Sequence, residues 1–298
     1  MRAIRRRPAR VLLCAATAAA LVVAVAAADA GTSGAPLSLP VVSGGAVDAV
    51  AIVGTTEYLA GSFGWVGGTA TGAFAEIAST GDPSPGRPPI GGEVSAAAPD
   101  GSGGWYIAGF FLSVGGVQVG GLAHIDSSGT RVATFQPGVV SGVQAIAVSG
   151  STVYAGGWCV AEGSGGCENL VAFDATSGAP TGFSPSITLS GGGPYVVSVF
   201  ALAVSGTTLY VGGRIDGVNG ATRHDLAAFD TSTGDVTSWN PQITSASAHG
   251  AVFALAVSGS TVYAGGGFDT VNGSTARNKT ADACPSRSVT TFMQQYIP

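Results

Sequence analysis

Hydrophobic residues beyond position 30 fall into short runs of five to seven, and glycine or a Ser-Gly pair ends most of these runs. Val, Ala, Tyr and Phe dominate the runs, and no amphipathic helical period is visible, so the pattern predicts short β-strands. Several runs are apolar at nearly every position, which is typical of strands that are buried on both faces. The hydrophobic pattern therefore predicts an all-β protein.

The runs belong to a long repeat. The segment ALAVSGTTLYVGG at 201–213 returns as ALAVSGSTVYAGG at 254–266 and as AIAVSGSTVYAGG at 145–157, and WYIAGFF and EYLAGSF further upstream are poorer copies. A tyrosine marks each copy at intervals of about 50 residues, which is the size of one supersecondary unit in a repeat protein. The five marker residues are Tyr58, Tyr106, Tyr154, Tyr210 and Tyr263.

The second half of each unit also recurs. Residues 226–241 read LAAFDTSTGDVTSWNP, and 170–185 and 122–137 follow the same plan: an apolar run ending in Asp, a Ser/Thr/Gly turn, and an aromatic residue shortly before Pro. The carboxylates of such aspartates can accept backbone N–H groups across the turn. We therefore assign a structural role in turns to Asp126, Asp174 and Asp230.

Each unit supplies four short strands, two from each half. An antiparallel four-stranded sheet with both faces covered, repeated radially, is a blade of a β-propeller. The sequence thus predicts an all-β fold, a β-propeller of about five four-stranded blades. The expected organisation is a signal peptide at 1–30, an N-terminal strand and linker at 31–45, and repeats at 46–92, 93–142, 143–195, 196–250 and 251–298, the last one degenerate or truncated.

The segment LYVGGRIDGVNGATRHDLAAFDTSTGDVTSWNP at 209–241 resembles the repeat of the delta-60 repeat family of β-propellers, which occur in exported bacterial proteins. The resemblance is close over residues 143–275 and looser over 46–137. It implies the propeller fold. It implies no particular function, because the propeller scaffold carries unrelated activities in different proteins.

The first thirty residues have the layout of a secretory signal peptide. Five arginines between Arg2 and Arg10 precede an apolar stretch of 18 residues at 11–28, and Ala28-Asp29-Ala30 offers a small-x-small cleavage site. This order of features is the signal-peptide pattern. An uncleaved membrane anchor is the alternative, because the stretch lies at the lower edge of spanning length. We expect a secreted or cell-surface protein.

Both ends of the repeat region depart from the pattern. LPVVSGG at 39–45 is similar to the tail of a repeat, so we expect an N-terminal strand that can close the ring by completing the last blade. Beyond residue 278 the expected apolar run is replaced by KTADACPSRS, which fits a frameshift or truncation. It also fits a degenerate fifth blade in which VTTF at 289–292 takes the place of VTSW at 236–239. An incomplete ring would expose strand edges and favour self-association.

Composition and charge narrow the classes of partner. The chain has 48 glycines, and only 10% of its residues are charged, whereas about 25% is usual. Once residues 1–30 are removed, seven basic and sixteen acidic residues remain, a net charge of about −9. Such a surface repels nucleic acids and anionic membranes. We expect no nucleic-acid partner, and membrane association only if the signal segment stays uncleaved.

The cysteines predict a crosslink in one loop. Cys159 and Cys167 lie eight residues apart in WCVAEGSGGC, and an exported protein favours a disulfide between them. Two free thiols are the alternative. Cys284 is left without a partner, in line with the aberrant C-terminal sequence. Neither a CxxC pair nor a neighbouring histidine completes a four-ligand metal set.

The histidines and acidic loops show no catalytic pattern. His224 and Asp225 are adjacent, but no nucleophile elbow accompanies them, so we interpret them as an exposed loop pair. The loops DGVNG at 216–220 and DTVNG at 269–273 offer oxygen ligands for calcium. They lack the dense ligand spacing of calcium loops, and an Asn-Gly turn explains them. We predict no catalytic residue, metal site or cofactor.

The sequence leaves a binding role as the leading hypothesis. Trp239 recurs as an aromatic position and is assigned to the core, whereas Trp158 in the cysteine loop is the candidate ligand contact. We expect an exported, noncatalytic binding or scaffold module for an extracellular glycan or protein. The alternatives are a propeller enzyme, either glycoside-active or quinone-dependent, and a truncated remnant of a longer repeat protein.

Overall fold

A computed structural model gives the structure of the chain. It describes residues 41–53, 56–77, 81–138, 140–163, 166–189, 196–245, 250–275 and 291–296. These residues form antiparallel β-sheets and include no helix, which confirms the all-β prediction. Within the same ranges, no helix could therefore span a membrane. The predicted signal peptide at 1–30 lies outside the described residues.

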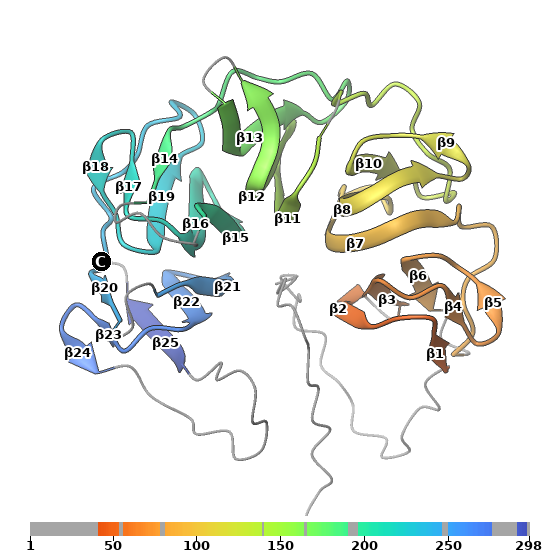
Figure 1. The fold of residues 1–298 in the computed structure, drawn as a ribbon, viewed down its shortest axis with the longest axis horizontal. Helices are drawn as coiled ribbons and strands as arrows, with labels where there is room; N and C mark the ends of the chain where they lie inside the picture. Colours follow the sequence, from red (N-terminus) through yellow and green to blue (C-terminus); the bar gives the residue numbers. More distant parts are fainter. Residues whose placement is uncertain are drawn as a thin grey trace, which may run out of the picture.

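Five units of three paired strands follow one another along the chain. They are β2–β3–β6 (Val47–Val53, Thr56–Gly61, Phe74–Ile77), β7–β8–β10 (Ile90–Pro99, Trp105–Val114, Leu122–Ile125), β11–β12–β13 (Val143–Ser149, Thr152–Gly163, Gly166–Asp174), β15–β16–β19 (Ser198–Ser205, Thr208–Arg214, Leu226–Asp230) and β21–β22–β25 (Val252–Ser258, Thr261–Gly266, Thr291–Tyr296). We call them the first to fifth sheets. Figure 1 shows them in order around an arc, with the first and fifth sheets at its two ends.

One irregularity of register is common to all five sheets. The pairing between the first two strands shifts at a Val-x-Ala step, as between Val143 and Ala145 in the third sheet. The glycine paired with each of these valines lies so close to a backbone carbonyl oxygen that a Cβ atom would collide with it. The five glycines are Gly61, Gly109, Gly157, Gly213 and Gly266. A bulge of this kind bends the strand, so close backbone approach accounts for this recurring glycine.

In the first four units, the predicted fourth strand is wrong as a continuous strand. The segment after the turn makes only an isolated bridge to the third strand, for example Phe173–Pro180 and Ile77–Pro83. Proline, which has no N–H group to donate to a ladder, stands at two of these bridges. Arg131 and Val236 form the equivalent bridges in the second and fourth units, so proline alone does not limit the pairing. The chain then crosses to the next repeat, where β14 (Ile187–Thr188) pairs with β17 (Gly217–Val218) and β20 (Ile243–Thr244) pairs with β23 (Thr270–Val271).

The remaining short strands pair with strands already named or connect the N-terminal segment to the first repeat. Strands β9 (Val117–Gln118), β18 (Ala221–Thr222) and β24 (Ser274–Thr275) pair with β8, β17 and β23. β1 (Val42–Ser43) pairs with β4 (Trp65–Val66), which pairs with β5 (Thr69–Ala70). Val42 pairs with Val66 of the first repeat in the same way as Ile187 pairs with Val218 of the fourth repeat.

Neither predicted arrangement of the chain ends appears in full. The fifth sheet takes its third strand from β25, which pairs with β22 as β19 pairs with β16. Residues 291–292 thus lie in a third strand, and their assignment to a fourth strand within VTTF is wrong. The rest of the predicted closing segment, up to residue 40, lies outside the described residues, and closure of the ring stays a prediction.

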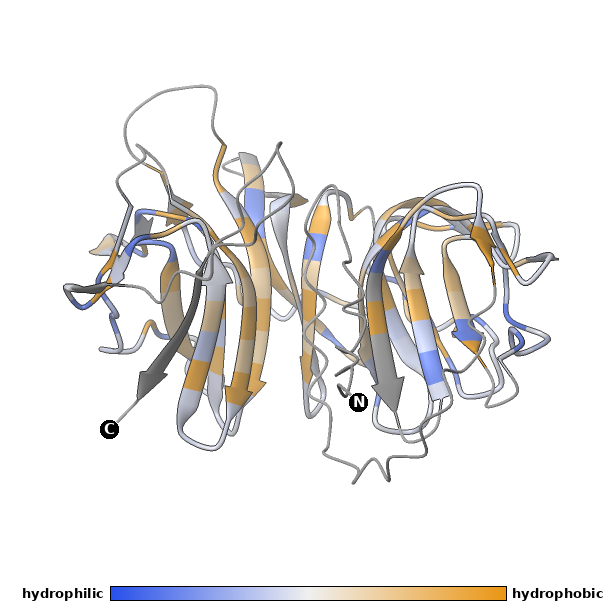
Figure 2. Cartoon of the chain, turned by 90° about the horizontal axis from the view of Figure 1, so that it is seen from below, coloured by the Kyte–Doolittle hydropathy of each residue, from blue (hydrophilic) through white to orange (hydrophobic). Residues whose placement is uncertain are grey.

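The apolar core lies between successive sheets. Four clusters join the first sheet to the second, the second to the third, the third to the fourth and the fourth to the fifth. Figure 2 shows the hydrophobic segments along the strands of neighbouring sheets. Trp105, Phe173 and Phe229 are among the fully buried side chains, and burial of a large apolar side chain contributes about 1.5–3 kcal/mol. Packing between repeats therefore holds the molecule together.

Candidate functional site

A groove of about 840 Å³ lies between the second sheet and the segment that leads to the third sheet. Strands β8, β9 and β10 and residues between Arg131 and Ser141 form its walls. Leu112 is 73% exposed and Phe110 is 44% exposed, whereas their neighbour Phe111 is 1% exposed. Large apolar side chains gathered at one exposed place are typical of an interaction site.

The strand geometry explains why these side chains face outwards. Phe111 belongs to the cluster between the first and second sheets, and adjacent residues of a strand point to opposite faces. Phe110 and Leu112 must therefore point away from that cluster. β8 continues into β9 through Gly115 and Gly116, whose φ values are +58° and +77°, as a tight hairpin turn requires. The hairpin carries Leu112 into the groove wall.

The other end of the groove is polar. His124 lines it, and the Nε2 atom of His124 lies 3.0 Å from Oδ2 of Asp100. The imidazole stacks on the ring of Tyr106, with 4.2 Å between ring centroids. Burial alone would raise the pKa of Asp100, but hydrogen bonds from His124, Ser102 and the Gly104 backbone outweigh it and hold the pKa below its ordinary value.

Tyr106, on which the imidazole of His124 stacks, joins the second sheet to the third. The hydroxyl of Tyr106 donates a hydrogen bond to the backbone oxygen of Ala175, at 2.6 Å, in the third sheet's turn. Burial, followed by the nearby carboxylates of Asp100 and Asp174, raises the pKa of Tyr106. The phenol thus stays protonated and donates across the junction. Asp100 and His124 are 24 residues apart, and no local motif in the sequence could have connected them.

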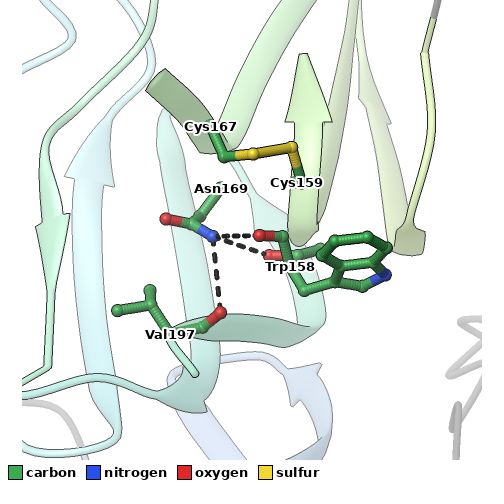
Figure 3. Close-up of a disulfide and its surroundings, with 6 residues drawn as sticks. Trp158, Cys159, Cys167, Asn169 and Val197 are labelled. Atoms are coloured by element: carbon green, nitrogen blue, oxygen red, sulfur yellow. Dashed lines mark hydrogen bonds between the residues drawn. A yellow bond between two sulfur atoms is a disulfide. The ribbon is translucent and has the colours of Figure 1, made fainter. Parts of the chain in front are cut away.

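The structure places the predicted ligand contact beside the cysteine loop. Cys159 and Cys167 form a disulfide with an S–S distance of 2.05 Å, drawn in Figure 3. Trp158 is 44% exposed. Its indole lies against Gly142, where an added Cβ would come within 2.5 Å of the indole Nε1 atom. Gly142 directly follows the groove residue Ser141, so Trp158 lies next to the groove, and its role as a ligand contact stays a prediction.

Asn169 fixes the base of the same loop. Its side-chain amide donates to the backbone oxygens of Trp158 at 2.8 Å, Gly157 at 3.3 Å and Val197 at 3.4 Å. Figure 3 shows these bonds beneath the disulfide. Val197 leads into the fourth sheet, so this amide ties the third sheet to the fourth.

The three turn aspartates accept backbone N–H groups at the same place in three repeats. Oδ1 of Asp126 accepts from Ser128 and Thr130, each at 2.9 Å. Asp174 accepts from the N–H groups of residues 176 and 177, and Asp230 from those of residues 232 and 233. Hydrogen bonds to the carboxylates, from Ser128 above all for Asp126, lower their pKa values. Each aspartate thus organises its turn.

In the loops 216–220 and 269–273, which offered oxygen ligands for calcium, the Asn side chains accept hydrogen bonds from neighbouring backbone instead. Asn219 and Asn272 have φ values of +48° and +49°. Their Oδ1 atoms accept N–H groups of the preceding repeat, from Ser186 at 2.9 Å and from Gln242 at 3.0 Å. Over the ranges that the structure describes, His, Cys, Asp and Glu form no group of three that could hold a metal ion. His249 and Cys284 lie outside those ranges.

The interpretation of His224 and Asp225 as an exposed pair is wrong for Asp225. Asp225 is 8% exposed and has a φ of +60°. Burial raises its pKa to about 6, partly offset by a hydrogen bond from the Ile215 backbone. The Nδ1 atom of His224 lies 3.5 Å from Oδ1 of a different carboxylate, that of Asp216. The positive φ brings Asp225 inwards, which a simple alternation of strand faces does not foresee.

Comparisons with known proteins give likeness at the level of fold. No family model matches the chain, and no curated protein matches its sequence. Among solved structures, it is similar to the extracellular domain of a protein described as a one-component system from B. thetaiotaomicron, with 13% identity and a TM-score of 0.45. That match covers 73% of this chain and 24% of the other, so the matched region spans about a quarter of that extracellular-domain chain.

Two computationally designed proteins are also similar. Ika4 matches with 15% identity and a TM-score of 0.38, over 69% of this chain and 91% of its own. Ika8 matches with 15% identity and a TM-score of 0.43, over 76% of this chain and 70% of its own. These likenesses concern β-sheet architecture and carry no substrate or partner to this chain.

Proposed function

We propose that the protein is an exported, noncatalytic β-propeller that binds an extended apolar segment of an extracellular protein. The observation that carries the proposal is the groove beside the second sheet, with Phe110 and Leu112 exposed in its wall. An extended peptide can place alternate apolar side chains into such a groove.

The propeller assignment, with about five blades of the delta-60 repeat type, is supported by the repetition itself. Five sheets share one strand order and one bulge position. Neighbouring sheets pack face to face around an arc. Export is supported by the N-terminal arginines, the apolar stretch and the cleavage site of the sequence.

The lining favours a peptide over a glycan. Sugar sites combine a flat aromatic platform with many polar partners, whereas this groove has an apolar wall made of Phe110, Leu112, Val119, Phe135 and Val140. His124 and Arg131 are the ionisable side chains in the described lining. Asp100 holds Nε2 of His124 and the Nδ1 atom is buried, so Arg131 is the one of the two that can pair with a polar group of the ligand. Apolar anchors inside a polar rim are the usual anatomy of a protein interface.

A peptide-selection experiment tests the proposal. The chain without residues 1–30 is immobilised and offered a phage-displayed library of random linear peptides. We expect enrichment of peptides with large apolar residues at alternate positions, and at least about tenfold weaker binding by Leu112→Ser and Phe110→Ser. Val196→Ser, at a position that is 61% exposed, is the matched control and should bind as the parent chain does.

Two results would overturn the proposal. The first is binding to a glycan array that Trp158→Ala abolishes, together with no peptide enrichment. The second is turnover of a glycoside or quinone-dependent substrate by the purified chain, which would make the protein an enzyme.

A further inference from the structure

One arginine in the wall of the groove has a guanidinium group without a partner. Elsewhere in the described chain, Arg87 is held by an ion pair, Arg223 by two backbone oxygens and Arg214 by contact with a phenyl ring. Within the same described residues, the side chain of Arg131 makes no hydrogen bond, ion pair or ring contact. Arg131 is half-buried and lines the groove. Its guanidinium is therefore a cation that a ligand in the groove can reach.

The carboxylates near this end of the groove are bound to other groups. Asp100 accepts hydrogen bonds from His124 and from the backbone of its own turn. Asp126, five residues before Arg131, accepts from the backbone of the turn that it organises. A carboxylate for Arg131 must then come from the ligand. A guanidinium group binds a carboxylate through two parallel hydrogen bonds, which gives both strength and orientation.

The strand pairing sets the separation between this cation and the exposed apolar residues. Arg131 forms a bridge with Ile125, which pairs with Trp105 at the start of β8. Phe110 and Leu112 follow Trp105 by five and seven residues on that strand. At about 3.3 Å per residue, they lie about 17 Å and about 23 Å further along the strand direction. An extended peptide covers the same distances with about five and about seven residues.

We propose that the groove recognises an extended peptide segment that is acidic at one end and apolar at the other. The carboxylate of an Asp or Glu side chain binds Arg131, and two apolar side chains, two positions apart, contact Phe110 and Leu112. The acidic residue lies about five positions from the nearer apolar residue and about seven from the farther one. This inference rests on the proposed function, and it adds the charge and the spacing that the ligand must have. Charge complementarity carries it, because a neutral or basic residue would leave a half-buried guanidinium unpaired.

Parallel selections test the charge and the spacing. The chain without residues 1–30 and its Arg131→Gln variant are each offered the same phage-displayed library of random linear peptides. From the parent chain we expect peptides with Asp or Glu about five to seven positions from a pair of apolar residues. From Arg131→Gln we expect the apolar pair to stay enriched and the acidic residue to be lost. Thr222→Glu, which lowers the net charge equally at an exposed residue of β18, is the matched control and should select as the parent chain does.

Affinities of a synthetic peptide give the size of the effect. The most enriched acidic peptide is labelled with fluorescein, and its Kd is measured by fluorescence anisotropy beside analogues with Gln or Lys in place of the acidic residue. The Gln analogue should bind the parent chain at least about tenfold more weakly than the acidic peptide does. Arg131→Gln should bind the acidic peptide and the Gln analogue equally, and Arg131→Glu should prefer the Lys analogue.

The outcomes separate this inference from the proposed function. Enrichment of apolar pairs without an acidic residue, or equal affinity of the parent chain for the acidic peptide and the Gln analogue, would overturn the role of Arg131 and leave the peptide groove standing. Enrichment that Phe110→Ser and Leu112→Ser do not reduce, or no enrichment at all, would overturn the proposed function and this inference with it.

Discussion

Asp225 offers the sharpest test of how the repeats are joined. Its carboxyl group is buried, and an added Cβ on Gly250 would lie 2.6 Å from its Oδ2 atom. Asn169 holds the same position in the third sheet, directly before the recurring Leu of the third strand, and donates to three backbone oxygens. An ionised carboxylate cannot donate such bonds, whereas an amide can. Asp225→Asn should therefore suit the site better than the native residue does.

The magnitude follows from the pKa. Burial raises the pKa of Asp225 from its ordinary value of 3.8 to about 6. The folded state therefore favours the neutral acid, and the stability that this group contributes is fully present below about pH 4 and lost as the pH rises through 6. The difference between these two pKa values corresponds to about 3 kcal/mol. Asp225→Asn should gain up to about 3 kcal/mol over the parent chain above pH 7, and little at pH 4.

Urea unfolding at pH 4.5 and at pH 8 measures this difference. The reciprocal variant Asn169→Asp is the comparison, because a carboxylate at this half-buried position loses the three donated hydrogen bonds and should lower the stability at high pH. Equal stability of Asp225→Asn and the parent chain at both pH values would refute the reasoning. A lower free energy of unfolding for Asp225→Asn than for the parent chain at pH 8 would refute it too.

Three further predictions concern the turns and the cysteine loop. Replacing both Cys159 and Cys167 by Ser should lower the free energy of unfolding by about 2–3 kcal/mol in urea titrations; no change relative to the oxidised parent chain would contradict this. Asp126→Ala should lower the Tm at pH 7, and the difference should shrink as the pH falls through the lowered pKa of Asp126; a difference independent of pH would count against it. Gly142→Ala, at a φ of +62°, should displace Trp158 and shift its fluorescence, and an unchanged spectrum would be the contrary result.

The sequence predicted the parts of the fold that depend on local pattern. The recurring tyrosines and apolar runs placed the first two strands of each unit, because strands buried on both faces have few alternatives. The third strand of the fifth unit, β25, was assigned to a fourth strand instead. The fourth strand failed because the segment after the turn forms a single bridge to the third strand in the first four units, at Arg131 and Val236 as well as at Pro83 and Pro180. The run WYIAGFFLSV at 105–114 looks uniformly like core, so the exposure of Leu112 depends on tertiary structure alone.

The candidate site depended even more on tertiary contacts. The Asp100–His124 pair bridges 24 residues, and the burial of Asp225 depends on a positive φ and on the neighbouring sheet. Composition and spacing carry no signal for either feature. The cysteine spacing, in contrast, constrained a local loop, and the structure joins those two residues.

Hydrogen–deuterium exchange with a selected peptide tests the central claim most directly. The chain without residues 1–30 is labelled with and without the most enriched peptide of the phage selection. The account predicts slower exchange over 109–124 and 131–141, the walls of the groove, and no such slowing in Leu112→Ser. Protection confined to other sheets, or exchange that the peptide leaves unchanged throughout, would contradict the claim that this groove is the binding site.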